Sequence, residues 1–193
     1  MGRIASLNVA AAQPVEIHGR QVMTAIGKRP VEGARRVGPL GIEGDEQADL
    51  SVHGGLSKAV YAYPSEHYPF WQTVRGQARA ALWDDTLPPG ALGENLTLSG
   101  LLEKDVCVGD VLRFADCELA VSEPRFPCFK FNATMGFDQA AKLMFANAWC
   151  GFYLAVRIAG TLRAGESFEF IAGPREVGIV ELFRARAAAA KQR

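Results

Sequence analysis

Short runs of apolar residues, rich in β-branched and aromatic side chains, recur along most of the chain and are separated by turn residues. Runs of this kind are typical of β-strands. They occupy residues 3–10, 16–26, 59–64, 94–100, 105–115, 118–124, 153–162 and 167–172. Because helical segments do not alternate regularly with them, the pattern predicts a mostly β fold, a β-barrel with a few peripheral helices, and not a series of βαβ units.

Two segments inside the chain show helical spacing instead. Residues 64–76 follow a strand-like run, with Ser65 as a candidate N-cap and Pro69 in the first turn. Residues 137–151 place apolar side chains on one helical face, with Asp138 as a candidate N-cap. We therefore expect two short helices packed against the barrel.

The chain shows no internal repeat and no long linker, so we expect one domain. The barrel should occupy residues 1–172. Residues 173–193 begin like a strand or turn and end in an Ala- and Arg-rich stretch. We expect this C-terminal extension to be partly helical.

Composition and charge narrow the classes of function. The chain has 193 residues, and its hydrophobic fraction of 49% is enough for a sizeable core. It carries 21 Lys and Arg against 21 Asp and Glu, which argues against generic nucleic-acid binding. No apolar run is long enough to span a bilayer, and the N-terminus lacks the features of a secretory signal. We expect a cytoplasmic protein with no nucleic-acid or membrane partner.

The cysteine pattern is that of a reduced protein. Cys107, Cys117, Cys128 and Cys150 form no C-x-x-C pair, which would be typical of a zinc site or a redox dithiol. A chain of this size does not need a disulfide framework. Cys107 and Cys117 lie in strand-like runs, so we expect them to pack in the core.

The stretch 41–64 contains a first candidate site. Its glycines permit unusual backbone angles and the close approach of a ligand. Gly54 and Gly55 are followed by Lys58, and together they could bind an anion through backbone N–H groups and one cation. A polar turn of the barrel, fixed by local hydrogen bonds, explains the same residues equally well.

A metal site is a further interpretation of this stretch. Asp45, Asp49 and His53 carry side chains that can bind a divalent ion. However, no H-x-x-x-H pair accompanies them, and His18 and His67 stand alone in the sequence. The sequence therefore favours other roles for these residues over a dedicated zinc site.

The second candidate is the turn that precedes the run 94–100. Gly93, Glu94 and Asn95 form a tight turn that leads into a strand, and either polar side chain could close a pocket. An ordinary corner between a loop and a strand accounts for the same residues.

The third candidate is the segment EPRFPCFKF, residues 123–131. Its two prolines restrict the backbone, so Cys128 is expected in a fixed loop. Arg125 and Lys130 would lower the pKa of the thiol if they faced it, and a thiolate attacks sulfur or binds a soft metal. A buried structural thiol among phenylalanines is the alternative.

Taken in order, these segments resemble the sequence pattern of the MOSC family, the domain at the C-terminus of molybdenum cofactor sulfurases. The matching pieces are residues 44–61, 93–96, 108–110 and 124–130. Each piece is weak alone, but the ordered set is specific. The match is nearest to the YiiM-like stand-alone bacterial branch, and it covers nearly all of residues 1–172.

The resemblance implies a barrel of the kind also inserted in pyruvate kinase, with a pocket for the molybdenum cofactor, or molybdopterin. It implies that Cys128 is the catalytic residue, as a molybdenum ligand or a sulfur carrier. Lys58, Arg125 and the backbone of Gly54 and Gly55 suit the anionic phosphate and the pterin. The other residues expected at this pocket are Asp45, Gln47, Asp49, His53, Glu94, Asn95 and Lys130.

The YiiM-like branch is associated with the reduction of N-hydroxylated base analogues such as hydroxylaminopurine. This chain has no iron–sulfur cysteine cluster and no dinucleotide-binding motif. The resemblance therefore implies a molybdenum-dependent oxidoreductase that receives electrons from a separate flavin or iron–sulfur protein.

Two other functions remain open at the level of sequence. The domain could carry sulfur or cofactor to a client enzyme, without redox chemistry, through a persulfide on Cys128. It could also be a barrel that has kept its architecture and lost its chemistry. YiiM-like proteins often continue into a helical bundle, and residues 173–193 offer about one helix in its place.

Overall fold

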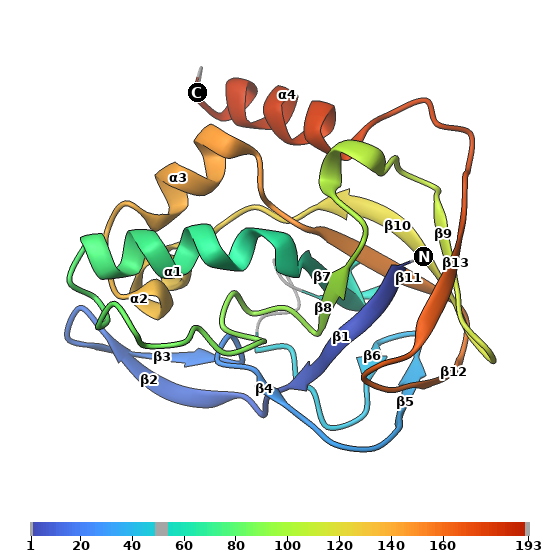
Figure 1. Cartoon of the computed structure of the whole chain (residues 1–193), viewed down its shortest axis with the longest axis horizontal. Coiled ribbons are helices and arrows are strands. Elements are labelled where there is room, and N and C mark those ends of the chain that lie inside the picture. The colour runs from blue at the N-terminus through green and yellow to red at the C-terminus, as the bar shows by residue number, and fades with distance from the viewer. Residues whose placement is uncertain (1, 49–53, 192–193) are drawn as a thin grey trace.

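A closed β-barrel forms the body of the protein. The computed structural model describes residues 2–48 and 54–191, and seven strands within them form the barrel in the order β13-β9-β10-β11-β7-β8-β1. β1 pairs back to β13 and closes the ring (Figure 1). The barrel strands are β1 (Gly2–Val9), β7 (Val60–Pro64), β8 (Leu96–Ser99), β9 (Val111–Arg113), β10 (Glu118–Pro124), β11 (Phe152–Ile158) and β13 (Ser167–Ile171). The prediction of a mostly β barrel is confirmed.

The barrel has mixed strand directions. β7 and β8 run parallel, and the other neighbouring pairs run antiparallel. A parallel pair needs a long crossover connection, and here residues 65–95 supply it. The connection carries a helix across the outside of the barrel and returns through the tight turn at Gly93.

Short strands extend the barrel at one end. β4 (Arg29–Pro30) pairs with the end of β1, and β5 (Arg35–Gly38) pairs with β6 (Gly41–Ile42) and β12 (Gly160–Leu162). The run 153–162 is therefore two strands, β11 and β12, instead of one. The run 105–115 is shorter than expected, because only 111–113 join the barrel as β9.

The run 16–26 is not one strand but part of a hairpin. β2 (Gln13–Ile17) pairs with β3 (Arg20–Thr24), and the turn between them places His18 and Gly19 at φ 52° and 74°. A two-residue turn with both φ values positive matches the natural twist of a hairpin. Figure 1 shows this hairpin extending away from the barrel strands, below α1.

The longer helices, α1 (Tyr68–Gln77), α2 (Phe129–Met135), α3 (Ala140–Asn147) and α4 (Ile179–Lys191), lie on one side of the barrel (Figure 1). The short 3₁₀ helices η1 (Leu56–Lys58), η2 (Ser65–His67) and η3 (Glu103–Asp105) lie in connections between strands. Both helices expected inside the chain are present, and Pro69 lies in the first turn of α1. Their N-caps differ from expectation: His67 and Gln139 hold the cap positions, not Ser65 and Asp138.

Large aromatic side chains join the helices to the barrel. Trp71 of α1 is fully buried, and its indole Nε1 donates a hydrogen bond of 2.6 Å to the hydroxyl of Tyr63 in β7. The ring of Phe131 in α2 packs edge-on against Trp71, with 5.6 Å between the centroids. Buried aromatic pairs of this kind fix orientation as well as area. They therefore hold α2, and Cys128 just before it, at a defined place on the barrel.

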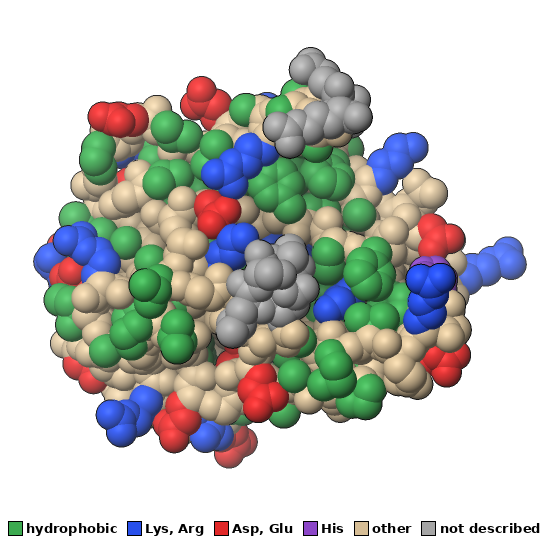
Figure 2. All heavy atoms as spheres, turned by 180° about the vertical axis from the view of Figure 1, so that it is seen from behind, with side chains coloured by type: hydrophobic (Ala, Val, Ile, Leu, Met, Phe, Trp, Pro, Cys, Tyr) green, Lys and Arg blue, Asp and Glu red, His purple; other side chains and the backbone are tan. Residues whose placement is uncertain are grey.

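The segment expected as a C-terminal extension contains α4. Ile179 and Phe183 of this helix are fully buried in the same hydrophobic core as the barrel. No helix within residues 2–48 and 54–191 is both long and apolar enough to cross a membrane. On the face in Figure 2, Lys and Arg side chains are interspersed with acidic and apolar ones, in keeping with the balanced formal charge.

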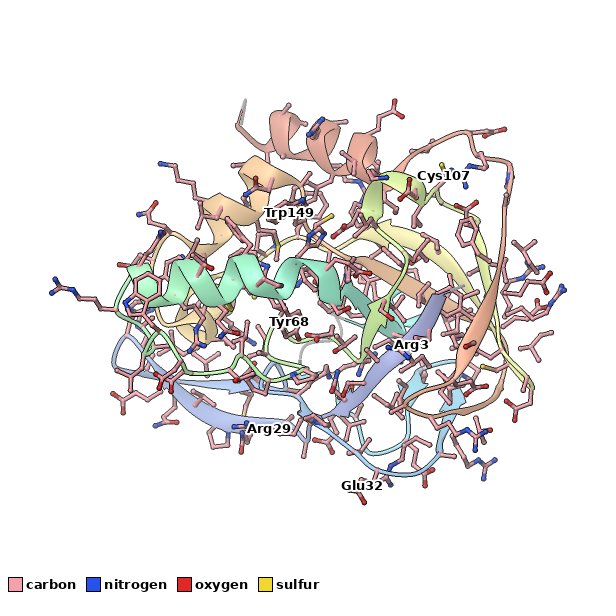
Figure 3. The ribbon with its side chains drawn as sticks, viewed as in Figure 1. Arg3, Arg29, Glu32, Tyr68, Cys107 and Trp149 are labelled. Atoms are coloured by element: carbon pink, nitrogen blue, oxygen red, sulfur yellow. The ribbon has the colours of Figure 1, made fainter. Side chains whose placement is uncertain are left out.

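The four cysteines are free thiols. Cys117 and Cys150 are buried, whereas Cys107 and Cys128 are partly exposed. Cys107 forms an isolated antiparallel β-bridge with Gly178, near the start of α4 (Cys107 is labelled in Figure 3). Cys107 and Cys117 were both expected in the core, but only Cys117 is buried.

Candidate functional site

A pocket beside the barrel brings together residues from distant parts of the chain. It encloses about 630 Å³ of empty space, its open mouth included. Its walls come from the end of β3 and the loop after it, the loop 45–48, η1, the turn before β8, the segment before α2, and β11. Seven of the predicted site residues line it: Asp45, Gln47, Lys58, Asn95, Arg125, Cys128 and Lys130.

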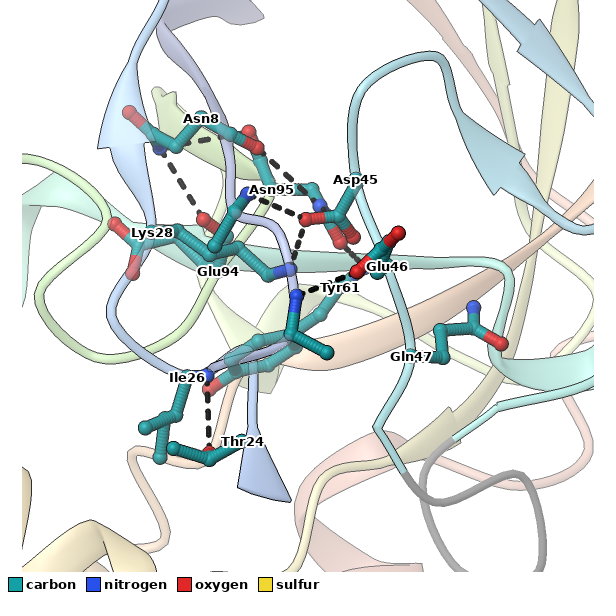
Figure 4. A network of polar contacts seen from close by, with 12 residues as sticks. Asn8, Thr24, Ile26, Lys28, Asp45, Glu46, Gln47, Tyr61, Glu94 and Asn95 are labelled. Carbon is teal, nitrogen blue, oxygen red and sulfur yellow. Dashed lines mark hydrogen bonds and ion pairs between the residues drawn. The ribbon is translucent and has the colours of Figure 1, made fainter. Parts of the chain in front are cut away.

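An ion pair forms one part of the pocket wall. The ammonium group of Lys28 contacts the carboxylate of Asp45, and both side chains are less than a tenth exposed (Figure 4). Asp45 also accepts hydrogen bonds from the backbone N–H of Ala10 at 2.9 Å and from Nδ2 of Asn95 at 2.9 Å. Burial lowers the pKa of Lys28, and the charge of Asp45 opposes this effect only in part. Lys28 was not predicted from the sequence.

Asn95 connects this ion pair to the barrel. Its Oδ1 accepts the backbone N–H of Tyr61 at 3.1 Å, and its Nδ2 also approaches the backbone carbonyl of Asn8 at 3.3 Å. Both ends of the amide are therefore held by the protein (Figure 4). Asp45 and Asn95 lie in the pocket as expected, but their polar atoms first serve to fix its shape.

Glu94 does not line the pocket. Its side chain is fully buried, and its carboxylate accepts hydrogen bonds from the hydroxyls of Tyr68 and Thr97 and the N–H groups of Gly90 and Leu92. Burial raises the pKa of Glu94, while these donors oppose the rise. The structure gives Glu94 an architectural place between α1 and β8 instead of a ligand-binding one (Tyr68 is labelled in Figure 3).

Arg125 is a buried cation at the pocket wall. It is 4% exposed, and its guanidinium lies 5.1 Å from the ring centroid of Tyr61 and 4.9 Å from that of Phe131. Burial disfavours its charge, but Tyr61, Tyr153 and Cys128 outweigh it, and the pKa of Arg125 is raised. The guanidinium is therefore charged.

One nitrogen of this guanidinium has no hydrogen-bond acceptor. Nη1 of Arg125 is buried and has no partner among the residues that the structure describes. Buried polar atoms are almost always hydrogen-bonded, and an unpaired charged donor is especially costly. An anionic or carbonyl group of a ligand in the pocket would satisfy it.

Cys128 lies three residues further on, at the start of α2. Its side chain is partly exposed at the pocket, and its carbonyl accepts the backbone N–H of Phe131 at 2.9 Å. Lys130 also lines the pocket, but its ammonium donates to the backbone carbonyl of Met23 at 2.8 Å. Lys130 thus ties α2 to β3, while Arg125 interacts electrostatically with Cys128.

Gln47 and Lys58 form another part of the pocket wall. The backbone N–H of Gly55 donates to Oε1 of Gln47 at 3.2 Å, and Nε2 of Gln47 donates to the carbonyl of Leu40 at 3.1 Å. Gln47 therefore holds the backbone at Gly55, and neither Gly54 nor Gly55 is among the described residues that line the pocket. The Nζ of Lys58 lies 5.8 Å from the ring centroid of Tyr153, another pocket residue not predicted from the sequence.

The metal interpretation receives no support from the described residues. Residues 2–48 and 54–191 contain no group of three or more His, Cys, Asp or Glu side chains placed to hold a metal ion. Asp49 and His53, two members of the proposed set with Asp45, lie outside the described residues. Besides Asp45, Gln47 and Asn95, the site residues that line the pocket are three cations and a thiol, which suit an anionic ligand with a soft metal or reactive sulfur.

The fold and this pocket agree with the comparison to known families. The MOSC domain model matches residues 49–169, more than half of the chain. The chain therefore belongs to the MOSC domain family. The match includes the loop before η1, the turn at Gly93 and the Arg125–Cys128 segment, and it ends before α4.

Individual relatives place the chain close to the stand-alone members of this family. YflK of Bacillus subtilis is 38% identical over 87% of this chain and 72% of its own length. YiiM of Escherichia coli is 36% identical over 82% of this chain and 68% of its own length. The crystal structure of YiiM from Geobacillus stearothermophilus superposes over the whole chain and 90% of its own, with TM-score 0.75 and 31% identity.

A longer relative contains the same region within a larger protein. A protein of Gibberella moniliformis named as a reductase is 33% identical over 81% of this chain, but the match covers only 27% of that protein. The domain thus occurs both in short proteins and as one part of a longer one.

Proposed function

We propose that the pocket binds the molybdenum cofactor and that the protein reduces N-hydroxylated compounds with electrons from a partner. The observation that carries this proposal is the buried guanidinium of Arg125, whose Nη1 has no partner among the described residues, in the same pocket as Cys128. A guanidinium in this state calls for an anionic acceptor. A thiol beside it calls for a soft metal or sulfur chemistry.

The residues present fit the cofactor. Arg125 and Lys58 would hold its phosphate and the polar edge of the pterin, and Cys128 would supply a sulfur ligand to the metal. Asp45 and Asn95 would keep the adjoining wall rigid through the contacts they already make. When bound, the cofactor supplies a centre that exchanges two electrons and accepts oxygen.

The proposed net reaction needs two electrons and two protons. The N–O bond of a hydroxylamine, R–NHOH, is broken, and the products are the amine R–NH₂ and water. A reductase-named relative at 33% identity supports redox chemistry for this domain. Lys28, paired with Asp45 on the pocket wall, carries an ammonium group whose pKa is lowered by burial.

The electrons would come from a separate flavin or iron–sulfur protein. The sequence has no G-x-G-x-x-G turn after a strand and no cluster of four cysteines for an iron–sulfur centre. Reduction by NADH alone is therefore not expected. Hydroxylaminopurine-type bases are the substrate class we propose to test first.

The test is an anaerobic assay of holo-protein with hydroxylaminopurine and either NADH or a chemical one-electron reductant. We expect turnover with the chemical reductant only. Rapid turnover with NADH alone would contradict the partner-dependent mechanism. No turnover with either reductant, together with persulfide accumulating on Cys128, would favour a sulfur carrier over an oxidoreductase.

A further inference from the structure

The C-terminal helix α4 contacts the segment from β10 to α2, which carries Arg125 and Cys128, and through Glu123 it reaches η1. This helix lies outside residues 49–169, the part that the family model matches, and it packs over α3 beside the barrel (Figure 1). Two side chains of α4, Phe183 and Arg186, make the relevant contacts. They are three positions apart and therefore lie on one face of the helix.

Phe183 packs against the cysteine segment. Its ring is fully buried and stacks on Phe126, with 4.9 Å between centroids and 24° between planes. It also stacks on Phe145 of α3 at 5.3 Å. Phe126 is the residue directly after Arg125, and Pro127 joins it to Cys128 with a restricted backbone. A fixed Phe126 ring thus limits the positions available to Arg125 and Cys128.

Arg186 reaches the segment that carries Lys58. Its Nη1 donates to Oε2 of Glu123 at 3.0 Å, and the other oxygen of Glu123 accepts from the hydroxyl of Ser57 at 3.4 Å. The hydroxyl of Ser122 also donates to the backbone carbonyl of Ser57. Ser57 precedes Lys58 in η1, so this chain of contacts connects α4 to the part of the pocket wall that contains Lys58.

We propose that α4 is a positioning element of the pocket. Phe183 holds the Arg125–Cys128 segment in place, and Arg186 holds η1 in place through Glu123. The two walls lie on separate elements, β10 and η1, which Ser122 and Glu123 join through Ser57. α4 contacts the first wall directly at Phe126 and Glu123 and reaches η1 through Glu123, so it supports the spacing between the thiol and Lys58. This inference rests on the proposed function only for its consequence, which is retention of the cofactor.

Two variants separate the two contacts. Arg186→Gln removes the charge from a half-exposed ion pair, and such pairs contribute little to global stability. Phe183→Leu keeps an apolar side chain in the core while it removes both ring stacks. Arg184→Gln is the matched control, because Arg184 is exposed on the same helix. Arg186→Lys is the conservative variant that keeps a cation opposite Glu123.

Hydrogen exchange of the protein without cofactor gives the first readout. We expect Arg186→Gln to speed amide exchange in residues 54–59 by about two- to fivefold, the change that loss of an exposed ion pair allows. Phe183→Leu should speed exchange in residues 122–130 and the alkylation of Cys128. Arg184→Gln and Arg186→Lys should match the parent protein, and exchange in β7 and β11 should not change.

Molybdenum content after expression in a cofactor-competent host gives the second readout. We expect both α4 variants to retain less metal than the parent and the control. If the parent itself binds no molybdenum, the proposed function fails while the exchange data still test the role of α4. Unchanged exchange at both segments in folded Arg186→Gln and Phe183→Leu would overturn the inference. If Phe183→Leu loosens the whole barrel, the exchange of Arg186→Gln at residues 54–59 decides the outcome.

Discussion

Two buried ionisable side chains, Glu94 just before β8 and Arg125 just after β10, differ in how the protein satisfies their polar atoms. Glu94 is fully buried, and Arg125 is 4% exposed. The carboxylate of Glu94 accepts four hydrogen bonds from groups of the protein. Nη1 of Arg125 has no partner within the described part of the chain.

This difference distinguishes a residue that stabilises the fold from a residue that is available to bind a ligand. A buried charge that the protein satisfies by itself stabilises one arrangement of the chain, and removing it leaves several donors unpaired. A buried charge that the protein leaves partly unsatisfied has a hydrogen-bonding position that a ligand, water or ion can fill. Glu94 and Arg125 were both expected at the pocket, and the hydrogen-bond partners distinguish their roles.

The largest expected effect is on stability at Glu94. Glu94→Ala should lower the free energy of unfolding by about 3 kcal/mol or more, because the donors of Tyr68, Thr97, Gly90 and Leu92 lose their acceptor. Urea unfolding followed by circular dichroism measures the change. Glu176→Ala, at an exposed acidic residue, is the control and should stay within about 0.5 kcal/mol of the parent. A loss of stability in Glu94→Ala no larger than in Glu176→Ala would show that the hydrogen bonds to Glu94 contribute little to the free energy of unfolding.

The second effect is on ligand affinity at Arg125 and Lys58. Arg125→Gln and Lys58→Ala should each weaken cofactor binding by about 1.5–3 kcal/mol, or roughly tenfold to a hundredfold. Arg125→Lys should also weaken binding if the contact is bidentate, since an ammonium cannot replace the guanidinium fork. Binding titrations of the folded variants, with Arg184→Gln as control, measure this. Unchanged affinity in both variants would show that the cofactor does not bind in this pocket.

The third effect is on thiol reactivity, which should differ between the buried Cys117 and the pocket residue Cys128. Burial raises the pKa of Cys117 to about 12, and burial also raises the pKa of Cys150. At about pH 9, roughly one Cys117 thiol in a thousand is then a thiolate, so it should react with iodoacetamide at least about tenfold more slowly than Cys128.

Mass spectrometry of the modified peptides reports each thiol separately. Cys128→Ser should remove the fastest site, and Cys107→Ser is the control. The reactivity of Cys117 should rise only as the pH approaches its raised pKa, because the thiolate is the reactive form. Equal rates for Cys117 and Cys128 near pH 9 would show that Cys128 is not a pocket thiol.

The smallest expected effect is on stability at Arg125. Arg125→Met keeps apolar volume between Tyr61 and Phe131 and removes a desolvated charge. Replacing such a charge by an apolar group is often close to neutral, so we expect a change below about 1 kcal/mol. Thermal unfolding without cofactor measures it. A loss of stability as large as that of Glu94→Ala would show that Arg125 mainly stabilises the fold and is not reserved for a ligand.

Local sequence signals predicted much of the barrel. The run 118–124 matches β10 residue for residue, because its apolar spacing and flanking turn residues are both local. α2 was missed, since two prolines precede it and the helix begins only at Phe129. The hairpin at His18 and Gly19 was also missed, because its turn depends on positive φ values that a histidine rarely adopts.

The site was predictable in its residue types but less so in their contacts. The motifs brought Lys58, Arg125 and Cys128 into one hypothesis, and the structure places all three around one pocket. Lys28 was missed, because its partner Asp45 is distant in sequence and nothing local indicates its burial. Glu94 and Asn95 are adjacent, and the sequence alone does not tell which of them faces the pocket.

The most direct test of the central claim is the molybdenum and pterin content of the protein purified from a cofactor-competent host. Metal analysis and pterin fluorescence would be measured on the parent, Arg125→Gln, Cys128→Ser and the control Arg184→Gln. We predict metal and pterin in near-equal amounts in the parent and the control, and a clear loss of both in Arg125→Gln. Cys128→Ser should lose metal more than pterin. A folded parent that contains neither, or an Arg125→Gln variant that retains both in full, would contradict the account.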